Sequence, residues 1–417
     1  MRGGRLTTMP RKARKPAAGK TSRGGVKRST KKPLGFWKRV PKILFGDDAR
    51  KSARHPKIIQ RKSKVKPAAR RKKRSAVFIK PEENPIISPR RENDWEAWQT
   101  FNPGVVLLDD PEKLRSGASK VHFLYRAIGS DGISRFGYAV SSDGFTIDER
   151  LSYPVFEHRL TKGAFNYYSF ASGGSFGGAE DPRLVRVNNE DTIYMTYTAC
   201  DEGLRVGLTS IKVDDFLNKK WRWRAPALIS PPDEVHKNWM LFPEKINGQY
   251  AILTSINPKI FITYRDNLDF KEGEYITSIY NGVCRRNCWD TCVRGAGAPP
   301  IKTEYGWLVF YHAIDERDPG KYKVGAMLLG LADPTVVLSR SQNPILEPEE
   351  VYENKGFKGG VVYVSGAVIK DGKLLLYYGA ADSYVGVAYA DFEKFLEELR
   401  KGIKPKLERM TLRKAHT

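Results

Sequence analysis

The segment Gly306-Trp307-Leu308-Val309-Phe310-Tyr311-His312 is an apolar run that ends in a tyrosine and a histidine. Its length and its aromatic and β-branched residues are typical of a buried β-strand. Four other parts of the chain hold a run of the same kind, each ending in Tyr or a polar residue: 121–126, 192–197, 249–254 and 373–378. A second strand-like run follows each of the five within about 10–20 residues: 136–140, 206–209, 260–264, 323–328 and 385–389.

These paired runs are internal repeats, and their spacing indicates the fold. Roughly 55–75 residues separate one unit from the next, which is close to a four-stranded propeller blade with long loops. Five repeats therefore predict an all-β, five-bladed β-propeller, which we assign to residues 77–417. The motif Asn84-Pro85-Ile86-Ile87 returns as Asn343-Pro344-Ile345-Leu346, so we expect the same element to open the first and the last blade.

One short C-terminal helix is the exception to the β-pattern. Phe392, Phe395, Leu396 and Leu399 follow one another at helical spacing. This spacing predicts a helix over 391–400 that packs outside the ring of blades.

The first part of the chain differs from the rest in charge. Residues 1–80 contain 29 Lys and Arg and two acids, whereas the remaining 337 residues contain 43 basic and 45 acidic side chains. A stretch so rich in Lys, Arg, Pro, Ala, Gly and Ser cannot bury enough apolar surface to offset chain entropy, so we predict a disordered basic tail over 1–76. Within it, residues 34–45 interleave large apolar residues with cations. That pattern is compatible with weak contact to nucleic acid or an anionic membrane surface, or with a plain linker.

The tail lacks an uninterrupted apolar stretch of about 7–15 residues, and no run of about 18 apolar residues occurs in the chain. We therefore expect no secretory signal and no ordinary membrane-spanning helix, with the cytoplasm as the default location. Four cysteines in 417 residues do not indicate a disulfide scaffold. Cys284, Cys288 and Cys292 fit neither a zinc ribbon nor a common iron–sulfur loop, so we predict packing or incidental thiols and no metal site.

Polar residues near the repeat strands are candidates for a functional site. In a propeller the loops at one end of the central channel converge, so residues just after the inner strands face one pocket. Taking the repeats as the inner strands, Arg126 ends the first, His312 ends the fourth and Asp382 follows the fifth. Asn102 stands before a Pro-Gly turn, and Glu180-Asp181-Pro182-Arg183 opens the second blade.

Three motifs, in this order, resemble glycoside hydrolase family 130: Gly178-Ala179-Glu180-Asp181-Pro182-Arg183-Leu184, Asn238-Trp239-Met240-Leu241-Phe242-Pro243-Glu244-Lys245-Ile246-Asn247-Gly248, and Gly295-Ala296-Gly297-Ala298-Pro299-Pro300-Ile301 running into the segment quoted first. The resemblance covers about Asn84 to Leu396. That family comprises inverting β-mannoside phosphorylases and a smaller group of β-mannosidases.

The resemblance also implies roles for individual residues. Asp181 matches the catalytic acid, which is thought to relay its proton to the glycosidic oxygen through a sugar hydroxyl. Asn102, Arg126 and Asp382 match residues that contact the mannosyl unit. Arg183 matches a residue that braces the loop of the catalytic acid. Residues that match the family's phosphate contacts are Lys237, Asn238, His312, Arg205 and Tyr322.

The two activities of the family make different chemical demands. An inverting hydrolase needs an acid and a second carboxylate that activates water, and Glu244 is a possible second carboxylate or simply shapes its loop. Phosphate is itself an anionic nucleophile and needs no base, but it needs a cationic cradle.

We therefore expect inverting phosphorolysis of a β-mannoside to α-mannose 1-phosphate and a shortened acceptor sugar, with inorganic phosphate as co-substrate and no cofactor. Two alternatives stay open: a β-mannosidase on the same fold, and a non-catalytic sugar-binding propeller with the basic tail as a tether.

Deleting residues 1–76 should leave turnover and melting temperature nearly unchanged, because the segment contributes charge and little buried area. Any salt-sensitive binding to anionic polymers or vesicles should weaken. Thermal denaturation and vesicle co-sedimentation of the full-length and truncated proteins test this. A large loss of thermal stability on truncation would contradict the prediction of a disordered tail.

Overall fold

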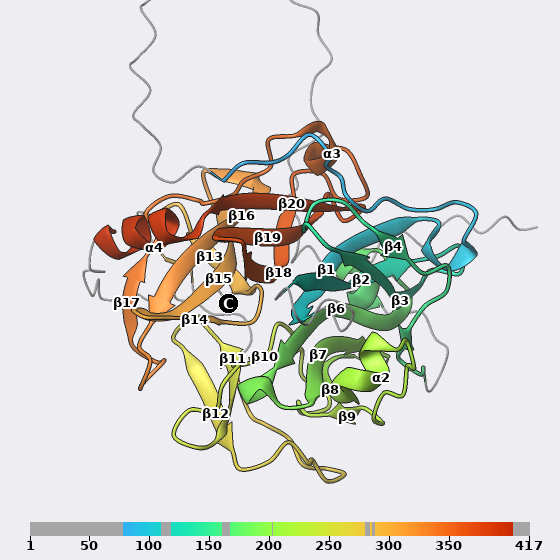
Figure 1. Ribbon diagram of the computed structural model, residues 1–417, viewed down its shortest axis with the longest axis horizontal. Coiled ribbons are helices and arrows are strands. Elements are labelled where there is room, and N and C mark those ends of the chain that lie inside the picture. The colour runs from blue at the N-terminus through green and yellow to red at the C-terminus, as the bar shows by residue number, and fades with distance from the viewer. Residues whose placement is uncertain are drawn as a thin grey trace, which may run out of the picture. The chain divides into compact units, whose positions relative to one another are not determined.

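The structure, a computed structural model, describes residues 78–109, 118–160, 167–201, 203–279, 284–285 and 288–402. The predicted tail over 1–76 lies outside these residues. Every described residue belongs to one compact unit, Arg71–Thr417. The described residues form mostly antiparallel β-structure with few, short helices (Figure 1), which confirms the predicted β class.

The described strands fall into five consecutive groups along the chain. The first group is β1 (Gln99–Asp109), β2 (Ser119–Ile128), β3 (Ile133–Ser141), β4 (Glu149–Arg150) and β5 (Phe156–Glu157), and the second is β6 (Gly177–Arg186), β7 (Thr192–Cys200), β8 (Leu204–Lys212) and β9 (Ala227–Leu228). The third is β10 (Met240–Leu241), β11 (Tyr250–Ser255) and β12 (Phe261–Arg265). The fourth is β13 (Cys292–Ala296), β14 (Ile301–Thr303), β15 (Gly306–Asp315), β16 (Asp318–Leu329) and β17 (Val337–Arg340), and the fifth is β18 (Val362–Lys370), β19 (Lys373–Ala380) and β20 (Tyr384–Asp391).

Hydrogen bonding within each group is antiparallel. A short parallel pairing of β3 with β6, Ile133 to Gly177 and Ser134 to Gly178, joins the first two groups into one nine-stranded sheet. The other three groups are sheets of three, five and three strands. In Figure 1 the groups follow one another in chain order, and β18 of the fifth group lies close to β1 of the first.

The five repeat strands are all present, but they are not the inner strands that we expected. They form β2, β7, β11, β15 and β19, and each is the middle strand of its group, hydrogen-bonded on both sides. The strands that approach one another are β1, β6 and β18, which precede the repeat strands. The repeat strands are the most apolar because they have a neighbour on each side and both faces are buried.

The two faces of each middle strand serve two different hydrophobic clusters, because successive side chains on a strand point to opposite faces. One cluster forms between each pair of consecutive groups, and one forms between the fifth group and the first. Representative pairs in chain order are Leu124 with Met195, Leu208 with Ile252, Leu253 with Val309, Phe310 with Leu376, and Leu375 with Phe123. Each of the five groups therefore packs on the next through one hydrophobic cluster, and the fifth packs on the first.

A tyrosine over a glycine recurs in four of the five groups. The tyrosine lies on the middle strand and the glycine is its partner on the next strand: Tyr125 and Gly137, Tyr197 and Gly207, Tyr311 and Gly325, Tyr378 and Gly386. A Cβ on any of these glycines would lie 2.3 to 2.6 Å from a tyrosine ring atom. Each glycine is thus required by the close approach of the ring, which explains the Gly in the second run of these repeats.

The segment around Asn84 joins the last sheet and does not open the first group, so that expectation was wrong. Ile79 and Ile87 pair with Tyr389 and Val385 of β20. Asn84 donates from Nδ2 to the carbonyl of Val387 at 2.7 Å and accepts from its N–H at 2.8 Å. We call residues 79–87 the N-terminal strap.

The matching motif around Asn343 lies at an equivalent place in the neighbouring sheet. Leu346 pairs with Val324 of β16, the strand that follows the repeat strand of the fourth group. The two motifs are therefore structurally similar, but each adds to the outer side of a sheet and neither opens a group.

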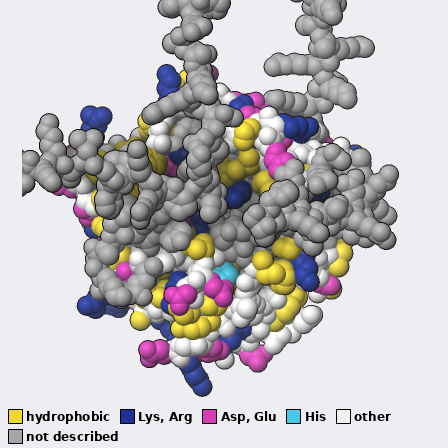
Figure 2. All heavy atoms as spheres, turned by 180° about the vertical axis from the view of Figure 1, so that it is seen from behind, with side chains coloured by type: hydrophobic (Ala, Val, Ile, Leu, Met, Phe, Trp, Pro, Cys, Tyr) yellow, Lys and Arg dark blue, Asp and Glu magenta, His cyan; other side chains and the backbone are white. Residues whose placement is uncertain are grey.

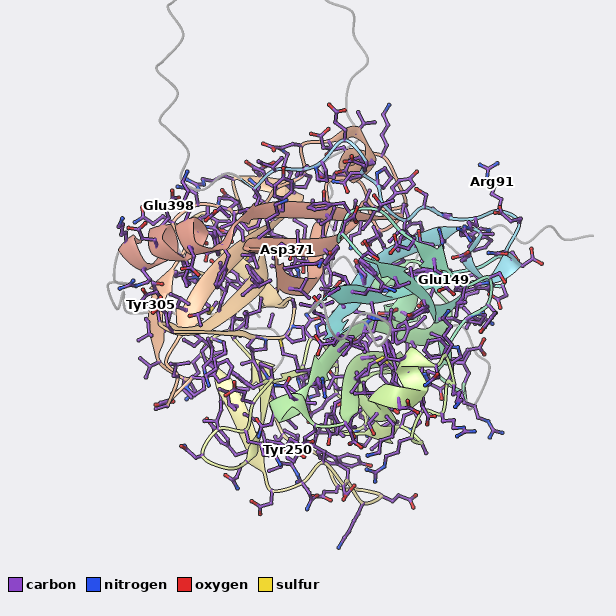
Figure 3. All side chains as sticks on the ribbon, viewed as in Figure 1. Arg91, Glu149, Tyr250, Tyr305, Asp371 and Glu398 are labelled. Atoms are coloured by element: carbon purple, nitrogen blue, oxygen red, sulfur yellow. A yellow bond between two sulfur atoms is a disulfide. The ribbon has the colours of Figure 1, made fainter. Side chains whose placement is uncertain are left out.

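The predicted C-terminal helix is confirmed as α4 (Phe392–Lys401), which begins where Asp391 accepts a hydrogen bond from the N–H of Lys394. Phe395, Leu396 and Leu399 are buried, and Arg400 lies over the ring of Tyr305, which Figure 3 shows beside the helix. The helices α1 (Tyr167–Gly173), α2 (Val213–Leu217) and α3 (Val351–Asn354) were not predicted, because seven residues or fewer are too short for an apolar stripe.

No described helix is long and apolar enough to span a membrane. On the visible described surface in Figure 2, Lys and Arg side chains are interspersed with Asp and Glu. This mixture agrees with the near balance of acidic and basic residues after position 80.

The contacts of the N-terminal strap predict a stability effect. Asn84→Ala should lower the free energy of unfolding by about 1–3 kcal/mol, because it removes two hydrogen bonds and leaves the Val387 N–H without its acceptor. Asn343→Ala is the matched control, since Asn343 is exposed and has no hydrogen bond among the described residues. Urea unfolding monitored by tryptophan fluorescence measures the free energy of unfolding of both variants. An equal loss in the two would contradict a specific contribution from the hydrogen bonds of Asn84.

Candidate active site

The backbone of several predicted site residues has an uncommon conformation. Left-handed backbone occurs at four of the predicted residues, with φ of 44°, 51°, 66° and 48° at Asn102, Asp181, Asn238 and Asp382. Asn and Asp adopt this conformation more readily than most residues with a side chain. Asn102 lies in a bulge of β1 and Asp181 in a bulge of β6, each followed by a proline. A bulge tolerates proline because its extra residue is unpaired, and it re-aims the side chain.

Asp181 is the centre of the polar cluster that these bulges create. The residue is 3% exposed, and its Oδ1 accepts a hydrogen bond from Asn102 Nδ2 at 2.8 Å. Arg126 Nη1 lies 3.4 Å from the same oxygen. Burial opposes ionisation, but the charges of Arg126, Arg183 and Lys237 outweigh it and hold the pKa of Asp181 below its usual value. Asp181 is therefore a carboxylate in the unliganded site.

Arg126 is wholly buried, and its positive charge is paired with the carboxylates of Glu180 and Asp181. Its Nη2 lies 2.7 Å from Glu180 Oε1, its Nε donates to Ser134 Oγ at 3.0 Å, and the guanidinium lies over the ring of Phe101 at 4.6 Å. Removing one partner of such a buried pair typically costs about 3–5 kcal/mol, because the other charge stays buried.

Glu180 is a wholly buried member of this cluster to which the sequence motifs gave no role. It stands in the quoted motif beside Asp181, yet we assigned it no role. Both of its carboxylate oxygens are engaged, and the donors besides Arg126 are Ser169 at 2.7 Å, Ser172 at 3.1 Å and Ser175 at 3.3 Å. The available signal was the cluster of serines at 169–175, just before the motif.

Arg183 connects the acid's backbone to three other parts of the chain. Its Nη1 donates to the carbonyl of Asp181 at 2.9 Å, and its Nε donates to the carbonyl of Gly297 at 2.8 Å. Its Nη2 donates to Asn238 Oδ1 at 3.0 Å and to the hydroxyl of Tyr363 at 2.9 Å. Arg183 is 1% exposed, so these bonds fix the loop that carries Asp181.

Lys237 and Asn238 lie just ahead of β10. Lys237 Nζ donates to Ser172 Oγ at 2.8 Å. Both residues line a small cavity of about 30 Å³ together with Asn257, Arg294 and Gly295. Arg294 is a further cation at this cavity that the sequence reasoning did not identify.

His312 stacks on Tyr363, whose hydroxyl donates to Asn238, and its predicted contact with phosphate stays a prediction. Its ring stacks on Tyr363 at 4.0 Å and lies 5.7 Å from Tyr322. Burial, with the nearby charge of Arg183, lowers the pKa of His312 to about 3. Its Nε2 donates to the carbonyl of Val364 at 2.9 Å, so the neutral ring leaves Nδ1 as a buried acceptor with no hydrogen-bond partner among the described residues.

Asp382 follows β19 and has a very different electrostatic environment from Asp181. Its carbonyl accepts a hydrogen bond from Gln99 Nε2 at 2.7 Å, and the residue is 5% exposed. Burial raises the pKa of Asp382 to about 6, although the charges of Lys358 and Arg126 oppose the rise. Lys358 belongs to a glycine-rich segment that approaches the turn closely, since a Cβ on Gly356 would meet the carbonyl of Ala381 at 2.6 Å.

Arg205 is not brought into this cluster by any described contact. Its Nε donates to the carbonyl of Ser230 at 3.0 Å, and its guanidinium lies over the ring of Tyr275 at 4.9 Å. It lines a separate cavity of about 450 Å³ with Tyr194 and Phe270. The side chain of Arg205 lies against the segment after β9 and the loop after β12, and its predicted contact with phosphate stays a prediction.

The cysteine prediction also needs correction, because Cys284 and Cys292 form a disulfide. Cys200 is a buried free thiol and Cys288 is half-buried. Cys284, Cys292 and Glu316 place three potential metal-binding atoms within 4.8 Å of one another. While the two sulfurs are joined they are not thiolates, which are the form that binds metal. The absence of a metal site stays a prediction.

Comparison with known proteins supports the resemblance seen in the motifs. The chain matches the model of glycoside hydrolase family 130, described as beta-1,4-mannooligosaccharide phosphorylase, over residues 61–401. It is 34% identical over 324 residues to a 1,2-beta-oligomannan phosphorylase of Thermoanaerobacter sp. (strain X514), covering 75% of this chain and 96% of that relative. It is 33% identical over 316 residues to a beta-1,2-mannobiose phosphorylase of the same organism, covering 74% and 96%.

A solved structure shows the same fold. The beta-1,2-mannobiose phosphorylase from Listeria innocua, in complex with beta-1,2-mannobiose, is similar with a TM-score of 0.59 and 25% identity, over 78% of this chain and 99% of that one. With a family model that matches most of the chain and relatives that are aligned over almost their whole length, this protein belongs to glycoside hydrolase family 130.

Proposed function

We propose that this protein is an inverting β-mannoside phosphorylase, which transfers a mannosyl unit to inorganic phosphate and releases α-mannose 1-phosphate and a shortened acceptor sugar. The relatives named above are mannoside phosphorylases, which supports the activity. The observation that carries the proposal is the composition of the site: one buried carboxylate, Asp181, lies among the three cations Arg126, Arg183 and Lys237.

The charges around Asp181 suit a reaction with phosphate. In the unliganded site the three cations keep Asp181 ionised, which is the wrong form for an acid. A phosphate dianion beside them adds negative charge, and like charge raises the pKa of a carboxyl group. The arrival of phosphate therefore favours the protonated Asp181, which then donates its proton toward the leaving oxygen by way of a sugar hydroxyl.

The remaining predicted residues divide between the two substrates. Asn102, Arg126 and Asp382 would hold the mannosyl unit, and Arg183 would keep the Asp181 loop in place. Lys237 and Asn238 would bind phosphate, together with Tyr322. A neutral His312 would contribute a hydrogen-bond acceptor and a stacking surface in place of a charge.

A hydrolase on this fold would need a second carboxylate to activate water. Glu244 does not serve, because it lies at the surface, where Lys302 Nζ is 2.5 Å from its Oε2. Asp382 is influenced by the charges of Arg126 and Asp181, but it belongs to the group predicted to contact the mannosyl unit. Phosphate requires no base, so the described carboxylates suffice for phosphorolysis.

We also propose that the five strand groups are the blades of a five-bladed β-propeller formed by residues 77–417. The support is the closed circuit of hydrophobic clusters, in which the fifth group packs on the first, and the approach of β1, β6 and β18. In such a ring the bulged strands line the central channel, which would place Asn102 and Asp181 at one substrate pocket.

The activity is tested with Asp181→Asn and a panel of β-mannobioses. The parent protein should release α-mannose 1-phosphate only when phosphate is present, and the variant should lose at least about a hundredfold in kcat, since general acid catalysis typically contributes 10²–10⁴-fold. Asp371→Asn is the matched control: Asp371 also has a left-handed backbone, with φ of 50°, and is exposed on the turn after β18 (Figure 3). Equal cleavage in phosphate-free buffer would replace this proposal with the hydrolase.

The raised pKa of Asp382 predicts an acid limb in the pH profile. If the carboxylate accepts a hydrogen bond from a sugar hydroxyl, kcat/KM for the mannoside should fall as the pH drops below about 6, where Asp382 becomes protonated. In Asp382→Asn this limb should disappear while overall activity is lower. Stability should change in the opposite sense, because a carboxyl with a raised folded-state pKa stabilises the fold at low pH and loses that contribution as the pH rises through 6. A pH profile of the variant that keeps the same limb would assign it to another group.

A further inference from the structure

Glu180 has a hydrogen-bonding pattern that the proposed reaction does not by itself explain. The residue is wholly buried, and its two oxygens have different partners. Oε1 accepts from Arg126 Nη2 and Ser169 Oγ, each at 2.7 Å, and from Ser175 Oγ at 3.3 Å. Oε2 accepts from Ser172 Oγ at 3.1 Å. Both oxygens therefore bond a serine of the helix α1, and only Oε1 also bonds the arginine.

Ser172 extends the contact of Oε2 to a second cation. Its hydroxyl donates to Glu180 and at the same time accepts from Lys237 Nζ at 2.8 Å. A serine hydroxyl has one donor and two acceptor sites, so both bonds form together. The polarity of the chain is fixed, since an ammonium can only donate and a carboxylate can only accept.

We propose that Glu180 is a positioning residue that holds two of the three cations around Asp181 in place: Arg126 directly, for the mannosyl unit, and Lys237 through Ser172, for phosphate. This inference rests on the proposed function. The carboxylate of Glu180, the residue before the proposed catalytic acid, would then fix the positions of the charges of Arg126 and Lys237.

The physical need for such a link comes from the lysine side chain. A lysine has four rotatable bonds, and holding its ammonium at one place costs up to about 2 kcal/mol of conformational entropy. Two cations also repel one another in a buried site unless negative charge lies between them. Ser172 and Glu180 answer both needs, because the hydroxyl gives Lys237 a fixed partner and the carboxylate lies between Lys237 and Arg126.

The arrangement predicts a separation between the two substrates. Ser172→Ala removes the bridge to Lys237 and leaves the direct bond between Glu180 and Arg126, so the KM for phosphate should rise about tenfold while the KM for the mannoside changes much less. Ser172→Thr keeps a hydroxyl at the same place and should restore a phosphate KM close to that of the parent.

The matched control is Ser169→Ala, a serine-to-alanine change in the same helix. Ser169 binds Oε1, the oxygen that holds Arg126, so its loss should affect the mannoside KM and not the phosphate KM. Glu180→Gln, which keeps the shape and removes the charge, should raise both KM values. Melting temperatures of all variants show whether a change is simply a loss of folded protein.

The outcomes separate this inference from the proposed function. If the parent cleaves mannosides without phosphate, the phosphorylase proposal fails. If the parent depends on phosphate but Ser172→Ala has the parent's phosphate KM, or if Ser172→Ala and Ser169→Ala change both KM values equally, the link through Glu180 is wrong. A phosphate-specific rise in Ser172→Ala that is rescued by Ser172→Thr establishes it.

Discussion

The guanidinium of Arg126 is held out of water between two carboxylates, those of Glu180 and Asp181. An unmatched charge in such a place costs several kcal/mol, so the arginine is stable there only while both acids keep their positions. In a regular strand, neighbouring residues point to opposite faces. The bulge in β6 lifts this restriction and lets two consecutive acids reach one arginine. The bulge, the serines around Glu180 and the hydrogen bond from Asn102 all follow from the need to satisfy this buried group.

The repeated part of the fold could be predicted from the sequence because each middle strand is buried on both faces. Such strands read as continuous apolar runs, and the tyrosine and glycine partners recur with them, as in Tyr311 and Gly325. Local sequence also determined α4, whose apolar spacing and Asp391 cap lie within one short segment. The apolar runs and the helix α4 depend on residues that are close in sequence. A sequence pattern shows such local relations directly.

The wrong expectation about Asn84 depended on contacts between distant segments, and so do the surroundings of His312 and Arg205. The motif at Asn84 shows that a strand pairs somewhere but does not say with which sheet, and its partner is β20. His312 could carry a charge by residue type, but burial, together with the nearby charge of Arg183, lowers its pKa and keeps the ring neutral. Arg205 has the right charge for an anion site, and its side chain donates to the carbonyl of Ser230. Glu180 needed the serines of α1 beside it before its role was visible.

The N-terminal strap has a consequence for the order in which the chain is made. The bond between Asn84 and Val387 spans 303 residues, so the ribosome releases the strap long before its partner strand. Contacts between residues so far apart raise the contact order, and they form late because loop-closure entropy opposes them. During synthesis the earlier groups can fold one after another as they emerge, while the strap has no strand to pair with. The two ends of the folded chain therefore meet only after translation has passed β20, and this meeting completes both the last sheet and the cluster in which Phe78 packs on Phe395.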